Sequence, residues 1–276
     1  MPELPEVEVV RRGLQRWTAG RTVREVAVLH PRAVRRHPAG AGDFESLLRG
    51  RTLSSVQRRG KFLWWELGDH ALVGHLGMSG QFRVDGQPGE HTRIIFDLDA
   101  ALLFDDQRTF GGMWVDPLHD GLPVSLAHVE PDPFSGEYDR ARVVRVIRSR
   151  RAPVKALLLD QAVVSGIGNI YADEALWRAR VHWRTPGEAL SARKVGQLLD
   201  AATEVMGSAI EAGGTSFDSL YVNVNGSSGY FQRDLMAYGQ EGLPCQRCGT
   251  PIVREPFANR SSYRCPRCQR IPGGGL

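Results

Sequence analysis

The sequence predicts an α+β protein of two domains. The N-terminal domain is expected to be an antiparallel β-sandwich with a leading helix, and the C-terminal domain to be helical and to end in a zinc-stapled β-hairpin. Short stretches rich in Val, Ile, Phe and Trp recur through residues 21–118, separated by Gly, Asp and Pro; this spacing is typical of an antiparallel sandwich or barrel. Apolar residues recur at helical spacing through residues 140–212. All four cysteines follow residue 244, in two C-x-x-C pairs.

The composition is that of a globular, weakly basic protein. The 276 residues suit one large domain or two ordinary ones of about 100–200 residues. No apolar run approaches the roughly 20 residues that a membrane helix needs. The net charge of +4 barely favours nucleic acid; clustered arginines suit phosphate contacts, although a GC-rich coding bias produces the same excess. The first residues lack the basic and apolar regions of a targeting peptide, so a cytoplasmic protein is expected.

The chain opens with MPELPEVEVV, and a helix is predicted over residues 5–17. Pro5 suits the first helical position, where its missing N–H would be unpaired anyway. Glu3 and Glu6 lie at or before the helix start, where carboxylates favour the positive end of the helix dipole. One apolar stripe recurs at helical spacing, at Val7, Val10 and Leu14.

The predicted strands follow, and with the first helix they make up a domain of residues 1–118. The stretches expected to form them are VREVAVL, TLSSVQ, KFLWWEL, ALVGHL, QFRVD, TRIIFDL and ALLFDD. A linker rich in Pro, Asp and Gly is predicted at 119–140.

The helical domain is expected at 141–235, with helices at 140–149, 153–164, 169–180 and 191–212. The last helix is expected to stop at Gly213 and Gly214. Residues 215–230 are small and polar and include an Asn-Gly pair, so they are interpreted as a mobile loop. The remaining module, at 236–270, contains the cysteines.

The cysteine spacing predicts a structural zinc site. Two C-x-x-C pairs with 16 residues between them can place four thiolates around one Zn²⁺ ion and leave no open position; the residues are Cys245, Cys248, Cys265 and Cys268. Two disulfides or a redox pair are the alternative, which the expected compartment disfavours. The basic segment between the pairs is predicted to form a β-hairpin suited to DNA or to another protein.

Two glycines, Gly166 and Gly168, lie between predicted helices, and Asn169 opens the second one. The free amides at that helix start could bind a phosphate of a nucleic-acid backbone. An ordinary corner between two helices explains the same residues.

Pro2 has a possible chemical role. Methionine before a small residue is normally removed, which would leave the secondary amine of Pro2 as the N-terminus. An α-amine has a pKa of about 8, so much of it is unprotonated near neutrality and can form an iminium with a carbonyl-like carbon. Glu3 and Glu6 are near enough in sequence to move protons. Most chains that begin Met-Pro nevertheless use the proline for nothing special.

The motifs together are specific. MPELPEVE is followed by RRGKFL, GHLGMSG, QRTFGG, SGIGNIYADE, YGQEGLPC and the terminal cysteine pattern. From residue 1 to about 270 the chain resembles the formamidopyrimidine-DNA glycosylases, base-excision enzymes that remove 8-oxoguanine and ring-opened purines and cleave the abasic site. The resemblance implies a helix-two-turn-helix domain, damaged double-stranded DNA as partner, a monomer, one structural zinc ion and association with the nucleoid.

The resemblance also implies catalytic roles. Pro2 would attack C1′ of the damaged nucleotide, Glu3 would be the general acid, and Glu6 would support the site. Lys61 matches a lysine that aids β-elimination and contacts phosphate, and Arg260 matches a hairpin arginine linked to phosphate binding and δ-elimination. Solvated side chains in turns are the structural alternative for the last two.

Further positions match residues that contact DNA. Met78, Arg108 and Phe110 would fill the space left by an extruded base, although core packing explains Met78 and Phe110 equally well. His75, His91, Asn169 and Tyr238 match backbone-contacting positions, which ordinary packing residues can also occupy. The loop at 215–230 would fold over the extruded base.

Two positions depart from the family pattern. Thr109 stands where many members have an arginine that holds phosphate, which puts DNA affinity or opposite-base preference in doubt. Arg151 stands where lysine is common, and the charge is kept.

Three other readings remain. An endonuclease VIII-like glycosylase for oxidised pyrimidines shares the fold, but Leu4 favours the purine branch. A non-catalytic DNA binder would not need Pro2, Glu3 and Lys61 together. A zinc-ribbon interaction protein leaves the N-terminal motif and the glycine turn unexplained.

Overall fold

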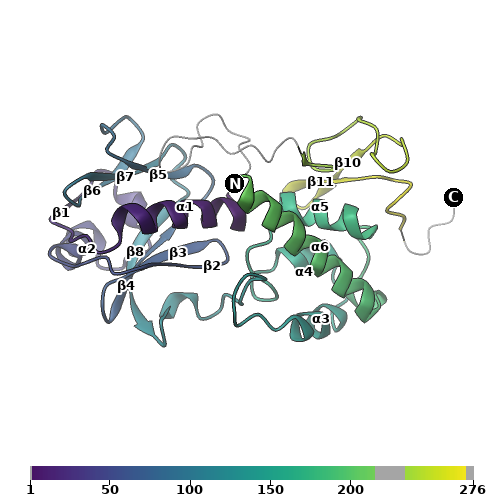
Figure 1. Ribbon diagram of the computed structural model, residues 1–276, viewed down its shortest axis with the longest axis horizontal. Helices are drawn as coiled ribbons and strands as arrows, with labels where there is room; N and C mark the ends of the chain where they lie inside the picture. The colour runs from purple at the N-terminus through teal and green to yellow at the C-terminus, as the bar shows by residue number, and fades with distance from the viewer. Residues whose placement is uncertain (1, 215–233, 272–276) are drawn as a thin grey trace. The chain divides into compact units, whose positions relative to one another are not determined.

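The computed structural model describes residues 2–214 and 234–271, and these divide into two compact units (Figure 1). The first unit comprises the described residues up to His128 together with 212–214, and the second comprises Val129–Glu211 and 234–271. The predicted loop at 215–230 lies outside the described residues. Within the described ranges, no helix has the length and apolar character needed to span a membrane.

The first unit contains the leading helix α1 (Leu4–Thr18) and two antiparallel sheets. The four-stranded sheet has the order β1-β6-β7-β5, with bounds Glu25–Val28, Thr92–Asp97, Ala101–Asp106 and Gly80–Val84. The five-stranded sheet has the order β2-β3-β4-β8-β9, with bounds Val56–Arg59, Phe62–Glu66, His70–His75, Gly112–His119 and Leu122–Pro123.

One apolar core joins the two sheets to α1. The ring of Trp65 from β3 meets the ring of Phe82 from β5 edge-on, with centroids 5.4 Å apart. The Trp65 indole N–H donates to Oγ1 of Thr18 at the end of α1 (2.7 Å), so a buried polar group is paired. The apolar stripe predicted on the first helix is buried in this core. A sandwich with a leading helix is therefore confirmed.

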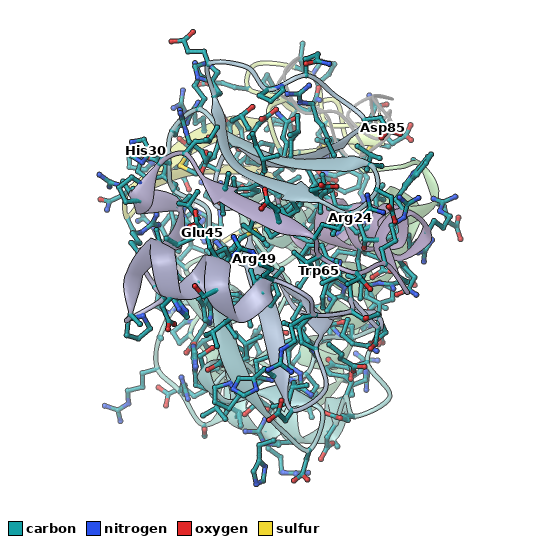
Figure 2. The ribbon with its side chains drawn as sticks, turned by 90° about the vertical axis from the view of Figure 1, so that its left-hand side faces the viewer. Arg24, His30, Glu45, Arg49, Trp65 and Asp85 are labelled. Carbon is teal, nitrogen blue, oxygen red and sulfur yellow. The ribbon has the colours of Figure 1, made fainter. Side chains whose placement is uncertain are left out.

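The sequence reasoning missed one helix of this unit. Helix α2 spans Gly40–Leu48 and follows a 3₁₀ turn, η1 (Pro31–Val34). Two glycines near its start weaken the helical signal, and a tertiary bond compensates: the Glu45 carboxylate accepts the Val28 N–H of β1 at 2.7 Å. Figure 2 shows Glu45 on this helix, beside the first sheet.

The second unit is helical and ends in a hairpin, as predicted. Its α-helices are α3 (Arg140–Arg148), α4 (Val154–Leu159), α5 (Asn169–Ala179) and α6 (Ala192–Glu211), and it includes the 3₁₀ turn η3 (Gly187–Ala189). A further 3₁₀ turn, η2 (Val124–Leu126), belongs to the first unit. Strands β10 (Val253–Phe257) and β11 (Arg260–Arg264) pair antiparallel.

Two boundaries differ from expectation. Helix α4 is shorter than predicted because Asp160 leaves the helix in extended backbone, and its Oδ1 accepts the Ala162 N–H (3.0 Å). The segment predicted as a linker begins inside β8, which runs to His119, and includes β9 and η2.

Candidate functional site

The start of α1 buries two carboxylates. Pro2 is buried, and the side chains of Glu3 and Glu6 belong to residues that are 2% and 3% exposed. Glu3 is the N-cap, and the Glu6 carboxylate accepts the Glu3 N–H at 2.8 Å, which is the reaching-back half of a capping box. Gly214, at φ +88°, lies so close that a Cβ there would be 3.4 Å from Glu6 Cγ. Pro2 and the two acids are thus all buried at the start of α1.

Lys61 lies in the turn between β2 and β3, and this turn is tied to α1. The Arg58 guanidinium donates from Nε to the Glu8 carboxylate of α1 (3.0 Å) and from Nη1 to the Gly60 carbonyl (3.0 Å). Burial raises the pKa of Glu8, but Arg11, Arg58 and Arg12 outweigh it and lower the pKa to about 2. The charged carboxylate therefore anchors the turn that carries Lys61, which is itself buried.

His75 ends β4, opposite Phe62, the neighbour of Lys61. Its Nδ1 accepts the Gly77 N–H at 3.1 Å. Burial, with Arg36, Lys61 and Arg35 nearby, lowers the pKa of His75 to about 4. The ring is therefore neutral at pH 7 and carries its proton on Nε2, which leaves that nitrogen as a donor.

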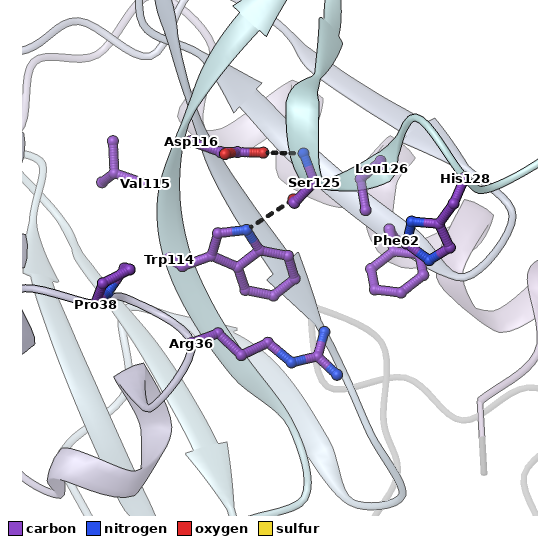
Figure 3. A pocket seen from close by; sticks show the side chains of 9 residues that line it. All are labelled: Arg36, Pro38, Phe62, Trp114, Val115, Asp116, Ser125, Leu126 and His128. Atoms are coloured by element: carbon purple, nitrogen blue, oxygen red, sulfur yellow. Dashed lines mark hydrogen bonds between the residues drawn. The ribbon is translucent and has the colours of Figure 1, made fainter.

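A cavity of about 450 Å³ adjoins Phe62 on the outer face of the five-stranded sheet (Figure 3). The Trp114 indole N–H donates to Ser125 Oγ (3.1 Å), and the Asp116 carboxylate accepts the Ser125 N–H (2.7 Å). Arg36 stacks over Trp114 with its guanidinium carbon 4.9 Å from the ring centre. The polar groups of the wall mostly satisfy one another, so the cavity points to no specific ligand.

Met78, Arg108 and Phe110 project from two touching loops. Met78 is 42% exposed and Phe110 47% exposed, and Arg108 is also exposed. A Cβ on Gly77 would be 2.3 Å from the Gly111 nitrogen, so the two backbones are in direct contact. Both apolar side chains are therefore presented to solvent, and the core-packing alternative is wrong for them.

The two loops share an anchor that the sequence reasoning missed. Asp106, 1% exposed, accepts the Ser79 hydroxyl on Oδ1 (2.6 Å) and the Gly111 N–H on Oδ2 (2.7 Å). Its own N–H donates to the His91 carbonyl (2.9 Å), and Nδ1 of His91 has no hydrogen-bond partner among the described residues. Asp106 is the last residue of the stretch ALLFDD, whose sequence predicts a strand and does not indicate this anchoring role.

Thr109 occupies left-handed backbone, with φ 53°, which is unusual for a β-branched residue. Its carbonyl accepts a hydrogen bond from Arg35 Nη1 (3.0 Å). Arg35 lies in the arginine-rich stretch 32–36, RAVRR, and nothing in that stretch signals this contact.

In the second unit the hairpin is attached to the start of α5. The Asn169 side-chain N–H donates to the Ser261 carbonyl (3.0 Å), next to Arg260, which is exposed at the hairpin turn. Lys155 and Asp173, both fully buried, form an ion pair of 2.7 Å. Burial raises the pKa of Asp173 to about 6 against the opposing effect of Lys155.

Asp173 also accepts from the hairpin, through the Ser262 hydroxyl (2.8 Å) and the Tyr263 N–H (2.9 Å). The buried pair of Lys155 and Asp173 was not found by sequence reasoning, because each of the two residues lies in an ordinary helical pattern.

Tyr238 lies beside the same hairpin, with its ring 5.0 Å from that of Tyr263. The buried Glu174 carboxylate accepts backbone N–H groups at Met236, Ala237 and Tyr238 (2.8–3.1 Å). The structure therefore gathers Asn169, Tyr238 and Arg260 around one hairpin. Arg151 is separate from them: it is exposed and lies 3.5 Å from Glu188.

The four cysteines form a metal site. Their Sγ atoms all lie within 4.8 Å of one another, and the Sγ of Cys248 is 3.5 Å from that of Cys265 and 3.6 Å from that of Cys268. A tetrahedral zinc with bonds of about 2.3 Å separates its sulfurs by about 3.8 Å, so the donor set fits one structural Zn²⁺ ion.

Family models match along most of the chain. The formamidopyrimidine-DNA glycosylase N-terminal domain matches residues 1–113, its H2TH domain matches residues 129–220, and the zinc finger found in FPG and IleRS matches residues 242–271.

Whole-length relatives agree. The formamidopyrimidine-DNA glycosylases of Streptomyces avermitilis and Rhodococcus erythropolis are each 55% identical, over 99% of this chain and 99% and 98% of theirs. The crystal structure of the MutM (Fpg) protein of Thermus thermophilus has a TM-score of 0.86 and 39% identity, covering 97% of this chain and 98% of that one. A Lactococcus lactis FPG mutant in complex with Fapy-dG-containing DNA has a TM-score of 0.87 and 31% identity, covering 98% and 100%. With its buried N-terminal acids and four-cysteine zinc site, the chain belongs to the formamidopyrimidine-DNA glycosylase family.

Proposed function

We propose that this protein is a bifunctional DNA glycosylase and abasic-site lyase that excises 8-oxoguanine and formamidopyrimidine from duplex DNA. The observation that carries the proposal is the buried start of α1, where Pro2 precedes two buried carboxylates. Similar structures support the substrate class, because relatives were solved with DNA containing Fapy-dG, an abasic site or carbocyclic 8-oxo-G. Because such an enzyme acts on chromosomal DNA, we expect the protein at the nucleoid in a bacterial cytoplasm.

The first step forms a bond between the Pro2 nitrogen and C1′ of the damaged nucleotide. The unprotonated amine supplies the electron pair, and the glycosidic C1′–N bond breaks as the base leaves. The Pro2 nitrogen loses its proton, and the departing base anion takes it up. Glu3 protonates O4′ as general acid while the C1′–O4′ bond breaks, and the nitrogen lone pair holds the open sugar as an iminium.

The iminium makes the 2′ hydrogen acidic. Its removal allows β-elimination of the 3′ phosphate, with Lys61 aiding the step. Loss of the 5′ phosphate by δ-elimination follows, with Arg260 contacting the phosphate. Hydrolysis of the iminium returns the Pro2 amine.

The other candidate residues would bind DNA. His75, as a neutral Nε2–H donor, suits a phosphate oxygen, as do the side chains of Asn169, Tyr238, Arg151 and His91. Met78, Arg108 and Phe110 would fill the gap left by the extruded base. Thr109 offers one hydroxyl donor. Affinity is then expected to fall as salt rises.

Borohydride trapping tests the chemistry. Duplexes carrying 8-oxoguanine opposite cytosine, an oxidised pyrimidine or no lesion are incubated with the protein and reductant. A covalent adduct on the 8-oxoguanine strand, mapped to the N-terminal peptide, is expected. Trapping on the pyrimidine lesion alone would assign the endonuclease VIII-like specificity. With Met1 shown to be removed, no adduct on any lesion would make the protein a binder without chemistry.

The variant Pro2→Gly is expected to lose nearly all base release and to keep its fold, because glycine replaces the secondary amine at a position outside the helix. Strand cleavage and thermal unfolding are measured side by side. Full activity in this variant would rule out Pro2 as the nucleophile.

A further inference from the structure

Arg35 holds the loop that carries Phe110 by its backbone. Its Nη1 donates to the carbonyls of Thr109 (3.0 Å) and Gly111 (2.9 Å), and its Nη2 donates to the carbonyl of Phe110 (2.9 Å). One guanidinium thus binds three consecutive carbonyls, which uses the fixed fork of arginine and which a lysine cannot reproduce.

The same loop is held from its amide side by Asp106. This carboxylate accepts the Gly111 N–H and the Ser79 hydroxyl, and Ser79 Oγ accepts the Arg108 N–H (3.1 Å). We call Met78, Arg108 and Phe110 the wedge. Arg35 therefore holds the loop that carries Arg108 and Phe110, and Asp106 ties this loop to the one that carries Met78.

The loop that carries Arg108 and Phe110 needs these hydrogen bonds to keep its conformation. Thr109 has φ 53°, a conformation that a β-branched residue rarely adopts unless its surroundings impose it. The side chains of Met78 and Phe110 are each more than two-fifths exposed, so their packing fixes the backbone less than a core side chain would. The hydrogen bond from Arg35 to the Thr109 carbonyl, with those to the next two carbonyls, therefore holds Thr109 in this conformation.

We propose that Arg35 is a positioning residue that keeps the wedge in the shape needed to enter the base stack. The inference rests on the proposed function. Entering the stack costs unstacking free energy, so a loose loop would insert poorly. Arg35 should therefore matter for extrusion of an intact damaged base. It should matter little for cleavage at an abasic site, where no base has to be unstacked.

The test compares two duplexes and two variants. Single-turnover strand cleavage is measured on an 8-oxoguanine:cytosine duplex and on the same duplex with an abasic site. Arg35→Lys keeps the positive charge and loses the triple carbonyl contact. Arg36→Ala is the control: it removes a charge at the next residue, whose guanidinium stacks over the Trp114 ring and acts on His75.

Arg35→Lys is expected to slow cleavage of the 8-oxoguanine duplex about tenfold and to leave abasic-site cleavage within about twofold of wild type. Arg36→Ala is expected to change the cleavage rates of both duplexes by the same factor. Stopped-flow fluorescence of 2-aminopurine beside the lesion should show slower extrusion in Arg35→Lys only.

An equal effect of Arg35→Lys on both duplexes, no effect on either, or the same split in Arg36→Ala would overturn the inference while the proposed function stands. Thermal unfolding identifies global misfolding, which would slow both reactions together. If the wild-type protein cleaves neither duplex, the proposed function itself fails and the inference fails with it.

Discussion

His75 illustrates how its neighbours decide one side chain's charge. Its Nδ1 is occupied by the Gly77 N–H, and burial beside Arg36, Lys61 and Arg35 lowers its pKa to about 4. Protonation would place a further cation among cations and would break the bond to Gly77. At neutral pH the ring is therefore a neutral donor through Nε2, which suits the phosphate contact proposed for it.

This pKa predicts a pH dependence of stability. The unfolded chain binds the proton below about pH 6.5, and the folded protein binds it only near pH 4. The contribution of His75 is thus fully present above pH 6.5 and is lost as the pH falls towards 4. We expect it to be on the order of 1–3 kcal/mol.

Urea unfolding of wild type and His75→Asn at pH 7.5 and 5 measures the effect. Asparagine offers an acceptor to the Gly77 N–H and does not titrate, so the variant should lose less stability between the two pH values. Parallel losses in the two proteins would show that His75 does not titrate as described. The other low-pKa histidine, His182 with a pKa of about 4, is present in both proteins and cancels.

The buried pair of Lys155 and Asp173 supports a second residue-scale prediction. Lys155→Met leaves the Asp173 carboxylate buried without its counter-charge, which should cost about 3–5 kcal/mol of unfolding free energy. Lys194→Met is the control, since among the described residues its ammonium bonds only a carbonyl, that of Ala179 (3.0 Å). A small loss in Lys155→Met, equal to that of the control, would contradict the ion-pair account.

At the scale of elements, the decisive link joins α1 to the β2–β3 hairpin. Arg58 bridges Glu8 of α1 and the carbonyl of Gly60, which precedes Lys61. Val56, at the start of β2, donates its N–H to Gln15 of α1 (2.7 Å). The helix that begins beside Pro2 and the turn that carries Lys61 therefore form one framework.

Breaking this link should loosen the Lys61 turn. Arg58→Ala is expected to destabilise the protein by about 2–3 kcal/mol, because it leaves a buried carboxylate and a carbonyl short of a donor. It should also slow β-elimination more than base release. Arg12→Ala is the control: Arg12 binds the same Glu8 (2.9 Å), is about half exposed and, within the described part of the chain, has no hydrogen bond to the hairpin, so the change should cost less than about 1 kcal/mol.

Product analysis after a short incubation separates base release from β-elimination. Hot piperidine cleaves the DNA at abasic sites that the protein has made but not yet cut. If Arg58→Ala and Arg12→Ala behave alike in stability and in this ratio, the bridge does not position Lys61.

The elements also show where local signals fail. The start of α1 was predicted to within a residue, because proline and acidic preferences act within one helical turn. Helix α2 was missed because its glycines oppose helix formation and Glu45 supplies a tertiary bond to β1. Helix α4 was predicted too long, since its apolar spacing continues past Asp160, whose backbone is extended.

At the scale of the whole molecule, each of the two units has its own apolar cluster, and the zinc site belongs to the second. The Trp177 indole N–H lies 3.4 Å from Cys245 Sγ, and the Arg247 guanidinium carbon lies 3.7 Å from the Trp177 ring centre. The zinc module is thus packed on α5 through a tryptophan that can report on it.

Chelation of the zinc is expected to lower the unfolding temperature of the second unit and to change Trp177 fluorescence, because metal binding stabilises such small modules directly. The first unit should keep its transition. Calorimetry with hydrogen exchange resolves the two units, and added Zn²⁺ should restore the original curve. DNA affinity should fall with the loss of the second unit. A single transition that shifts as a whole would show that the units unfold together.

The sequence by itself determined the zinc ligands, the leading helix and the family of the fold, because each of these depends on spacing within a few residues or on motifs in a set order. Pro2, Glu3 and Glu6 could be named for the same reason. Only the tertiary structure decided which residues hold the wedge loops and the Lys61 turn in place. The contacts of Arg35 with the wedge loop join residues 74 to 76 positions apart, and that of Arg58 with Glu8 spans 50. An arginine looks the same in sequence whether it is solvated or bound to carbonyls, since its partners are chosen by the packing of the sheets.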